Sequence, residues 1–362
     1  MANTFNYAEK YSPNIIEIIN QGALTSPFIT SNVEWTGAKT FHFTQMSTSG
    51  FKAHSRNGGW NKGTITQTDK DYTVTHDRDI SFLVDKADVD ETARTAAVEK
   101  VSQVFVQTQQ IPEVDCYTFS KIADYALNGT GLVKAHSLSD YTADNVYSNI
   151  VKLMGSGKLK YYRQRGSLVG YVVSEIMDLL AISKEKTLNI NDTTLTEDGI
   201  GVETRITKIN GVPLIEVVDT ERMKTLFDCT DGCVPDDEAM DINILFASVE
   251  TVKTVPKISS IYYFNAGKHT EGDGDLYQNR SFMDTFVFPN GIDGKIDSIL
   301  VDIDVPAYVT SNTYNTGDVV KQNNEVYKAK EDSITGAFTE SKWDKISSVS
   351  YTHLTLPTTS RV

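Results

Sequence analysis

The chain has 362 residues, of which 40% are apolar and 23% charged, with a formal net charge of -14. These values are typical of a globular protein of about two domains, and the acidic balance argues against a dedicated nucleic-acid binder, which normally carries a basic domain. The N-terminal sequence MANTFNYAEKYSPN predicts no secretory signal, and no apolar run approaches the roughly 18–20 residues that span a bilayer, so we expect no membrane segment.

Residues 39–68 form a basic segment within this acidic chain. The segment contains no Asp or Glu, and its cationic residues are Lys39, Lys52, Arg56 and Lys62. Apolar residues alternate from Phe41, the middle is rich in glycine, and alternation resumes at Tyr72 and continues to Val84. This pattern predicts a long β-hairpin with a flexible tip. A basic hairpin on an acidic body suits docking on a neighbour's acidic surface, and a solvated surface hairpin is the alternative.

Residues 88–127 show helical patterns. Asp88 and Glu91 resemble a capping box, and an apolar stripe continues to about Gln110. We expect Pro112 to end this helix and a second helix to cover residues 117–127. The sequence Asn-Gly-Thr-Gly that follows interrupts the helical pattern.

The chain from about residue 132 to residue 305 alternates helices and strands. Asn210-Gly211, between two alternating runs, predicts a hairpin with a type I′ turn. The other expected helices are residues 146–154 and 175–182, and the other expected strands are residues 168–173, 242–246, 258–264, 282–288 and 296–301. A helix-rich block whose strands are completed late indicates an α+β fold with an inserted domain.

Residues able to do chemistry are sparse. The six histidines lack the spacing of a zinc helix, and no Gly-x-Ser-x-Gly motif occurs. Cys229 and Cys233, with Asp231 between them, allow a metal site, but an ordinary polar loop is the preferred interpretation. The acidic loop around Asp273 is interpreted in the same way. Three cysteines in all predict no disulfide framework and a reducing compartment. We therefore expect no catalytic site, cofactor or metal, and interpret the chain as a structural building block.

The order of these segments resembles the major capsid protein of tailed phages, the Hong Kong ninety-seven-type coat fold. The resemblance covers residues 1–305, and the matching segments are residues 1–13, 39–82, 108–115, 119–123, 210–217, 222–225, 244–257 and 275–286. It implies an N-terminal arm, an extended β-hairpin loop, a peripheral domain with a long spine helix, and an inserted axial domain. The corresponding ranges are 1–38 for the arm, 39–83 for the loop, 84–130 with 240–305 for the peripheral domain, 90–110 for its spine, and 131–239 for the axial domain.

The resemblance also implies a function. Such proteins are not enzymes; they self-assemble as hexamers and pentamers into an icosahedral shell that encloses double-stranded phage DNA without sequence preference. Assembly would occur in the host cytoplasm, with the scaffolding protein and portal as separate chains. The extended loop would lie over the adjacent subunit, so Lys52, Arg56 and Lys62 become the expected inter-subunit contacts. The cross-linking triad of some relatives has no match here. An encapsulin-like nanocompartment shell is the alternative.

Residues 307–346 resemble a small all-β, chitin-type carbohydrate-binding module. The matching residues include Gly317-Asp318-Val319-Val320 and Trp343. The resemblance implies a three-stranded scaffold on which sugars stack against aromatic residues, and an outward knob that binds host-surface glycans. The expected sugar-binding residues are Tyr308, Tyr314, Tyr327 and Trp343. The alternative is that the aromatic residues form the small core of the knob. A glycan-binding or glycan-degrading protein is a less favoured function for the whole chain.

The final residues, 347–362, match neither neighbouring segment in composition. They resemble translated sequencing-adapter read-through, and we interpret them as a non-native tail that takes no part in the fold.

Overall fold

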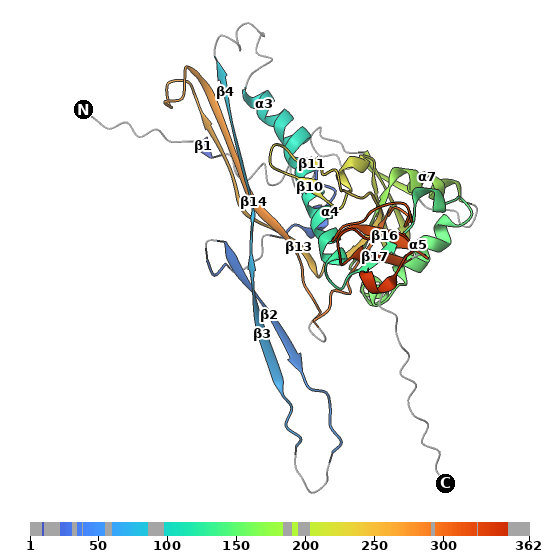
Figure 1. Cartoon of the computed structure of the whole chain (residues 1–362). Coiled ribbons are helices and arrows are strands. Elements are labelled where there is room, and N and C mark those ends of the chain that lie inside the picture. Colours follow the sequence, from blue (N-terminus) through green and yellow to red (C-terminus); the bar gives the residue numbers. More distant parts are fainter. Residues whose placement is uncertain are drawn as a thin grey trace, which may run out of the picture.

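The computed structural model describes residues 9–10, 22–30, 35–37, 39–54, 60–85, 98–183, 190–194, 203–290, 294–323 and 325–346. An elongated sheet with a projecting hairpin lies beside a broader α/β part and a small C-terminal module (Figure 1). Within these ranges no helix is long and apolar enough to cross a membrane. The capping box expected at Asp88 and the tail at residues 347–362 lie outside the described residues.

The predicted hairpin is formed by β2 (Thr40–Thr48) and β3 (Ile65–Thr73), which pair antiparallel with Phe41 opposite Tyr72. Alternation continues beyond β3, but β4 (His76–Asp85) leaves the hairpin and pairs with another strand. The change of partner occurs at Thr75, whose N–H and hydroxyl both donate to Asp284 at 2.9 and 2.8 Å. The hairpin therefore ends at Thr73, ten residues before the predicted end of the loop at residue 83.

The elongated sheet has the strand order β1-β13-β14-β4. Its strands are β1 (Glu9–Lys10), β13 (Val252–Phe264), β14 (Gly274–Val287) and β4, all antiparallel to their neighbours. β4 is an edge strand among the strands described, and exposure alternates along its whole length. One face of β4 therefore points to solvent and the other toward the helix that crosses the sheet.

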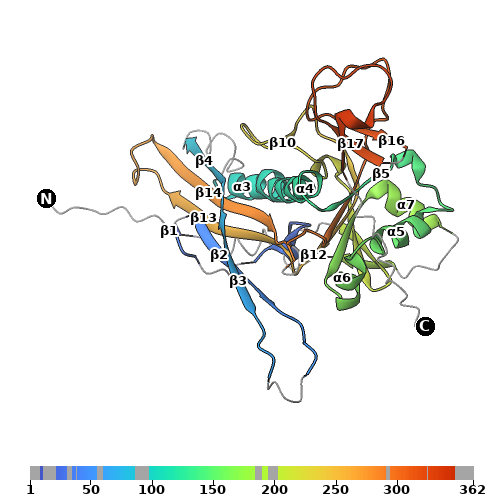
Figure 2. The ribbon, with the colours of Figure 1, turned by 60° about the horizontal axis from the view of Figure 1, so that its bottom comes forward.

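That helix is continuous through Pro112, so the prediction that it ends there was wrong. It consists of α3 (Val98–Phe105), the π-helical segment η2 (Val106–Gln110) and α4 (Ile111–Leu127), which Figure 2 shows as one rod. Proline removes an N–H and clashes with the carbonyl four residues earlier in a regular α-helix. A π-helical turn is wider, with bonds to the fifth residue back, and Ile111 N–H indeed donates to Val106. The π turn thus accommodates Pro112 in the first turn of α4.

The broader α/β part is built on a seven-stranded mixed sheet with the order β5-β15-β12-β6-β9-β8-β7. The strands are β5 (Leu132–Ala135), β6 (Leu168–Val173), β7 (Ile190–Thr194), β8 (Glu203–Ile209), β9 (Val212–Val217), β12 (Ile242–Ser248) and β15 (Ile299–Ile303). The helices beside it are α5 (Val146–Met154), α6 (Leu159–Arg165) and α7 (Ser174–Ile182). The type I′ turn between β8 and β9 is confirmed, because Asn210 and Gly211 have φ of 51° and 84°.

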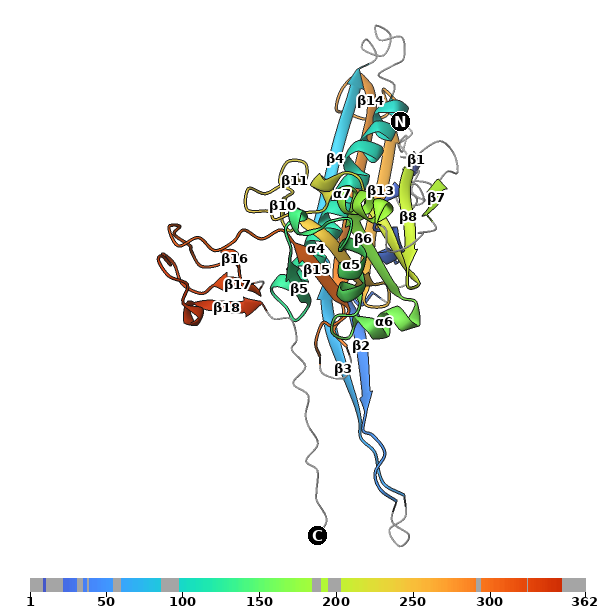
Figure 3. The same cartoon turned by 90° about the vertical axis from the view of Figure 1, so that its right-hand side faces the viewer.

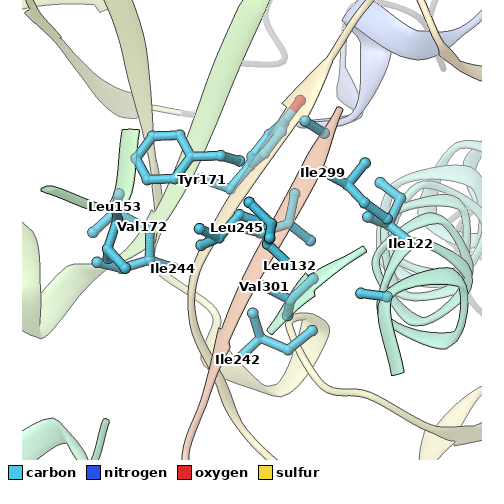
Figure 4. Close-up of a cluster of buried hydrophobic side chains, with 14 of the residues drawn as sticks. Ile122, Leu132, Leu153, Tyr171, Val172, Ile242, Ile244, Leu245, Ile299 and Val301 are labelled. Carbon is cyan, nitrogen blue, oxygen red and sulfur yellow. The ribbon is translucent and has the colours of Figure 1, made fainter. Parts of the chain in front are cut away.

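The core of the molecule lies on both faces of this sheet. Figure 4 shows Ile122 of α4 on one side of the central strands and Leu153 of α5 on the other. Tyr171 of β6 is fully buried, and its ring lies 5.1 Å from that of Phe119 on α4. The helix that crosses the elongated sheet therefore also covers one face of the seven-stranded sheet.

The strands of residues 240–305 are divided between the two sheets. β12 and β15 pair with β6 and β5 in the seven-stranded sheet, whereas β13 and β14 join the elongated sheet. Every residue of β12 and β15 is buried, so these strands need cover on both faces. In the part of the chain that the structure describes, the seven-stranded sheet between α4 and α5 supplies this cover.

A buried carboxylate fixes residues 22–30 against the helix. Asp115 of α4 has no exposed surface and accepts hydrogen bonds from the N–H and hydroxyl of Thr25 at 2.9 and 2.8 Å and from the N–H of Leu24 at 3.2 Å. Burial raises the pKa of Asp115, while the donors of Thr25 favour its charged form. Phe28, in the short 3-10 turn Ser26–Phe28, is held against Tyr171 with a ring distance of 5.8 Å.

We predict that Asp115→Ala lowers the melting temperature by about 3–5 °C, because three donors and their surroundings lose a buried partner worth about 2–4 kcal/mol. Differential scanning fluorimetry of the purified subunit measures this. Asp115→Asn retains an oxygen that can accept from Thr25 and should lose less. Equal melting temperatures for wild type and Asp115→Ala would contradict the assignment of this contact.

Candidate functional site: assembly surfaces

The far end of the hairpin is an exposed, basic and aromatic tip. We call Ser49–Ala53 and Trp60–Thr64 the hairpin tip. Lys52 and Lys62 lie close together, since Lys52 Nζ donates to the Lys62 carbonyl at 3.1 Å. Arg56 lies outside the described residues. The sequence analysis missed Phe51 and Trp60, whose side chains are 110% and 95% exposed. Their signal was two aromatic residues in a glycine-rich turn with no apolar pattern to bury them.

Hydrogen bonds between the two segments of the hairpin tip hold its shape. Asn61 Nδ2 donates to the Ala53 carbonyl at 2.8 Å, and Ser49 and Thr64 exchange two bonds of 2.9 Å. Ordering the tip in advance lowers the conformational entropy that a binding partner must overcome. The tip therefore presents its exposed side chains in a defined arrangement.

The exposed face of edge strand β4 is acidic. Asp77, Asp79 and Asp85 alternate along it and are all exposed. Arg280 of β14 makes two hydrogen bonds to Asp77, at 2.9 and 2.7 Å, and these hold the pKa of Asp77 below its ordinary value. Charged residues on an edge strand oppose uncontrolled pairing with another strand, and they also supply a surface for a basic partner.

The other face of β4 joins the elongated sheet to the seven-stranded part. Arg78 donates to Glu113 of α4 at 2.9 Å and to the carbonyls of Cys229 and Gly232. His76 lies 3.0 Å from the same Glu113, and its ring stacks on Tyr117 at 3.9 Å. Arg78 thus connects strand, helix and the loop between β10 (Phe227–Asp228) and β11 (Val234–Pro235).

Cys229 and Cys233 form a disulfide, a pairing that the sequence analysis did not predict when it expected no disulfide framework. The pairing of β10 with β11 brings the two ends of this short loop together, with Cα atoms 4.1 Å apart. Sequence spacing alone does not reveal that geometry. The inference of a reducing compartment loses its basis, and the metal interpretation of the pair is not supported. Across the described ranges no three His, Cys, Asp or Glu side chains are grouped to hold a metal ion, the loop around Asp273 included.

A cavity of about 300 Å³ lies between β4, the π-helical segment and β14, beside the disulfide loop. We call it the spine cavity. Its apolar wall is formed by Ile80, Phe82, Phe105, Val114 and Met283, and its polar border includes Arg78, Asp79, Gln110, Glu113, Asp231 and Asn279. Asn279 is 4% exposed, and its Oδ1 has no hydrogen-bond partner among the described residues. A buried acceptor in this state favours any partner that brings an N–H or O–H donor.

The C-terminal module is a three-stranded antiparallel sheet of β16 (Val319–Gln322), β17 (Glu325–Ala329) and β18 (Trp343–Ile346). It lies beside β5 (Figure 3). Successive residues of β17 pack in two different cores. Val326 belongs to the core of the large sheet, while Tyr327 belongs to the core of the module. The module is therefore packed on the body rather than free of it.

Polar contacts support this packing. Lys321 donates to Asp140 at 3.1 Å, and Lys328 donates to Asn128 at 2.7 Å. Burial alone would raise the pKa of Asp140, but the hydrogen bonds from Lys321 and from the Ser137 N–H outweigh it and lower the pKa. The contact thus favours the charged carboxylate.

The aromatic residues predicted to bind sugars are gathered in the module but are not a surface platform. Tyr314, Tyr327 and Trp343 are 8%, 7% and 2% exposed, and Tyr308 packs against them. Tyr308 and Tyr314 stack at 5.0 Å, and Tyr308 meets Trp343 edge-on at 5.6 Å. This burial favours the alternative interpretation, in which these residues form the core of the module. Sugar stacking requires an exposed ring face.

The fold as a whole is found in phage capsids. No protein-family model and no curated protein matches the sequence. Among solved structures, the mature capsid of bacteriophage PhiM1 matches with a TM-score of 0.51 and 14% identity over 84% of this chain and 89% of that chain. The capsid of Cyanophage P-SCSP1u matches with a TM-score of 0.51 and 12% identity over 84% and 91%. At these identities the likeness concerns the fold.

The chain therefore has the fold of a capsid shell protein. The particular proteins that it resembles are those of phage capsids, as the sequence resemblance predicted. The prediction that the chain has a phage coat fold is therefore confirmed.

We predict that Val326→Asp detaches the module, because a carboxylate would be buried in the apolar core that Val326 now completes. The melting temperature should fall by about 5 °C or more, and limited proteolysis should cut near residue 306. Lys330→Ala is the control, since its ion pair with Asp344 is largely exposed and contributes at most about 1 kcal/mol. Unchanged protease resistance in Val326→Asp would contradict the docking.

Proposed function

We propose that the protein is a non-enzymatic coat subunit that self-assembles, as hexamers and pentamers, into the icosahedral shell around phage double-stranded DNA. The observation that supports this most is the hairpin tip. Its aromatic and basic side chains are exposed although the tip is ordered by its own hydrogen bonds. Exposed aromatic residues in a preorganised loop are typical of a binding element, and the fold is one found in phage capsids.

The base of the hairpin supports the same function. Phe41 and Tyr72 pack against Phe286 of β14 at 5.2 and 5.4 Å, so the hairpin is fixed to the body at one end only. An anchored strand pair that extends past its own core can reach a neighbouring subunit. The acidic face of β4 offers complementary charge to Lys52 and Lys62 of such a neighbour.

The proposed partners follow from this role. Copies of the chain itself form the shell; a scaffolding protein and a portal act as separate chains in the host cytoplasm, and the product is the virion. The net charge of -14 suits a container that holds DNA without gripping it tightly, because affinity for nucleic acid depends on cationic contacts with phosphates. An encapsulin-like shell is the second candidate, and its content would be a protein cargo instead of DNA.

Electron microscopy of the expressed protein tests the function directly. Closed icosahedral shells, or isolated hexamers and pentamers, support a coat subunit. A stable monomer at all concentrations, checked by light scattering, would contradict it. Shells that enclose a co-expressed enzyme and exclude nucleic acid would favour the encapsulin-like alternative.

We predict that reversing three charges in the hairpin (Lys52→Glu, Arg56→Glu and Lys62→Glu together) prevents assembly and leaves the subunit folded. The described lysines are exposed, so the fold does not depend on them, whereas like charges would then face the acidic surface of a neighbour. Light scattering measures assembly, and circular dichroism measures the fold.

The matched control reverses Lys330, Lys342 and Lys345 in the C-terminal module and makes the same change in net charge. It should assemble like wild type if the location of the charge matters. Equal loss of assembly in both triple variants would assign the effect to net charge and return the hairpin to a simple surface role.

Glycan binding by residues 307–346 stays a prediction. The burial of Tyr314, Tyr327 and Trp343 supports a structural role for these rings in the core. A glycan array probed with assembled particles tests the prediction, and binding that is lost when residues 307–346 are deleted would support an outward, sugar-binding knob.

A further inference from the structure

We propose that the spine cavity receives the indole ring of Trp60 from a second copy of the chain. This inference rests on the proposed self-assembly and adds a defined partner site to it. Trp60 is 95% exposed in its own subunit, and the spine cavity has room for a side chain. Two copies can satisfy both requirements by the same contact.

The size and chemistry of the spine cavity suit a large aromatic side chain. Its volume of about 300 Å³ lies at the lower end of the range for ligand sites, which suits one side chain better than an extended ligand. Ile80, Phe82 and Met283 supply an apolar wall. The aromatic ring of Phe105, on the helix side, lies 5.5 Å from that of Phe82 and allows edge contacts with an inserted ring.

The spine cavity also contains a polar group that selects an N–H donor. Asn279 Nδ2 donates to Gln110 Oε1 at 2.9 Å and to the Tyr277 hydroxyl at 3.1 Å, which fixes the side-chain amide. The remaining atom, Oδ1, has almost no accessible surface and no partner among the described residues, so an incoming N–H reaches it when the cavity lining shifts on insertion. An indole carries a single N–H donor on an apolar ring, so Trp60 matches both the wall and the acceptor.

Trp60 is preferred to Phe51 for this reason. Both rings are exposed in the hairpin tip, at 95% and 110%, but a phenyl ring leaves Asn279 Oδ1 unpaired. Tryptophan is also the residue most often found as an energetic anchor at protein interfaces. Phe51 then lies outside the cavity, against the rim.

The hairpin of the same chain cannot deliver this side chain. β2 has nine residues and its base is fixed by Phe41, so at about 3.3 Å per residue the tip lies roughly 30 Å from that anchor. Figure 1 shows the hairpin pointing away from α3 and β4, between which the cavity lies. The occupant therefore comes from a neighbouring subunit.

The charges beside the two surfaces are complementary. Lys52 and Lys62 accompany Trp60 in the hairpin tip. The carboxylates of Asp79, Glu113 and Asp231 border the cavity against one guanidinium, that of Arg78, which already donates to Glu113 and two carbonyls. Such an arrangement guides the tip toward the cavity and fixes its orientation.

Photo-crosslinking tests the contact. The photoreactive residue p-benzoylphenylalanine replaces Trp60, the shells are assembled from a mixture of isotopically labelled and unlabelled subunits, and mass spectrometry locates the linked peptides. We expect mixed-label links to peptides that contain Phe105, Asn279 or Met283. Links in assembled shells that map only elsewhere would overturn the cavity assignment and leave self-assembly intact. A wild-type chain that never assembles would overturn both.

Substitutions supply the energetic test. Trp60→Ala should raise the concentration needed for assembly about tenfold or more, and Trp60→Phe, which keeps a ring but lacks the N–H, should have an intermediate effect. Phe51→Ala is the matched control in the same tip and should change it less than Trp60→Ala. Both side chains are exposed in the free subunit, so folding is not at risk. Trp60→Ala with wild-type assembly would overturn the proposal.

Discussion

The structure depends on the aromatic cluster at the base of the hairpin. Phe41 and Tyr72 stack at 5.7 Å, and Tyr72 meets Phe288 edge-on at 5.0 Å. Phe41 and Tyr72 belong to the hairpin strands β2 and β3, and Phe288 follows directly after β14. The cluster therefore joins the hairpin to β14. Phe51 and Trp60 of the hairpin tip belong to none of the apolar clusters that the described residues form. One anchored end and one exposed end are the basis of the proposal that the hairpin connects neighbouring molecules.

The second requirement is a rigid path from the hairpin to the large sheet, and the long helix supplies it. Val114 packs with Met283 under the elongated sheet, while Phe119 and Ile122, one to two turns later, lie in the core of the seven-stranded sheet. The π turn keeps these two faces on one rod despite Pro112. It also creates the widened backbone beside which the spine cavity lies. The hairpin is thereby connected to the large sheet through β14 and α4.

Local patterns were enough to predict much of this fold. Asn210-Gly211 specifies its turn without help from the rest of the chain, and β6 is an uninterrupted apolar run whose bounds, Leu168–Val173, coincide with the prediction. Pro112 misled the prediction because the compensating π turn depends on packing against the sheet. Strand β4 misled it because alternation shows which residues share a face but not which strand is the partner.

The candidate site was only partly predictable for the same reason. The net charge of a segment can be counted from its sequence, so Lys52 and Lys62 could be recognised as part of a basic segment without a structure. Trp60 carries no charge, and the signal of two aromatic residues in a glycine-rich turn is weaker, since an aromatic residue is usually part of a core. Asn279 becomes informative only when its two hydrogen-bond partners have been located in space and its Oδ1 is found to have none among the described residues. Unsatisfied groups are properties of the folded chain, so the sequence does not show them.

The number of contacts in a closed shell determines how strong each one needs to be. Every subunit would offer one hairpin tip and one spine cavity, so each tip contact is repeated around the shell and subunits are held by several neighbours at once. A single contact of modest affinity then suffices for a stable particle, while an incorrectly placed subunit with one contact dissociates. A small anchored aromatic residue with flanking charges provides such an affinity, and a large apolar interface would not allow this correction. The exposed aromatic residues Phe51 and Trp60 lie in a tip whose two lysines favour its solubility before assembly.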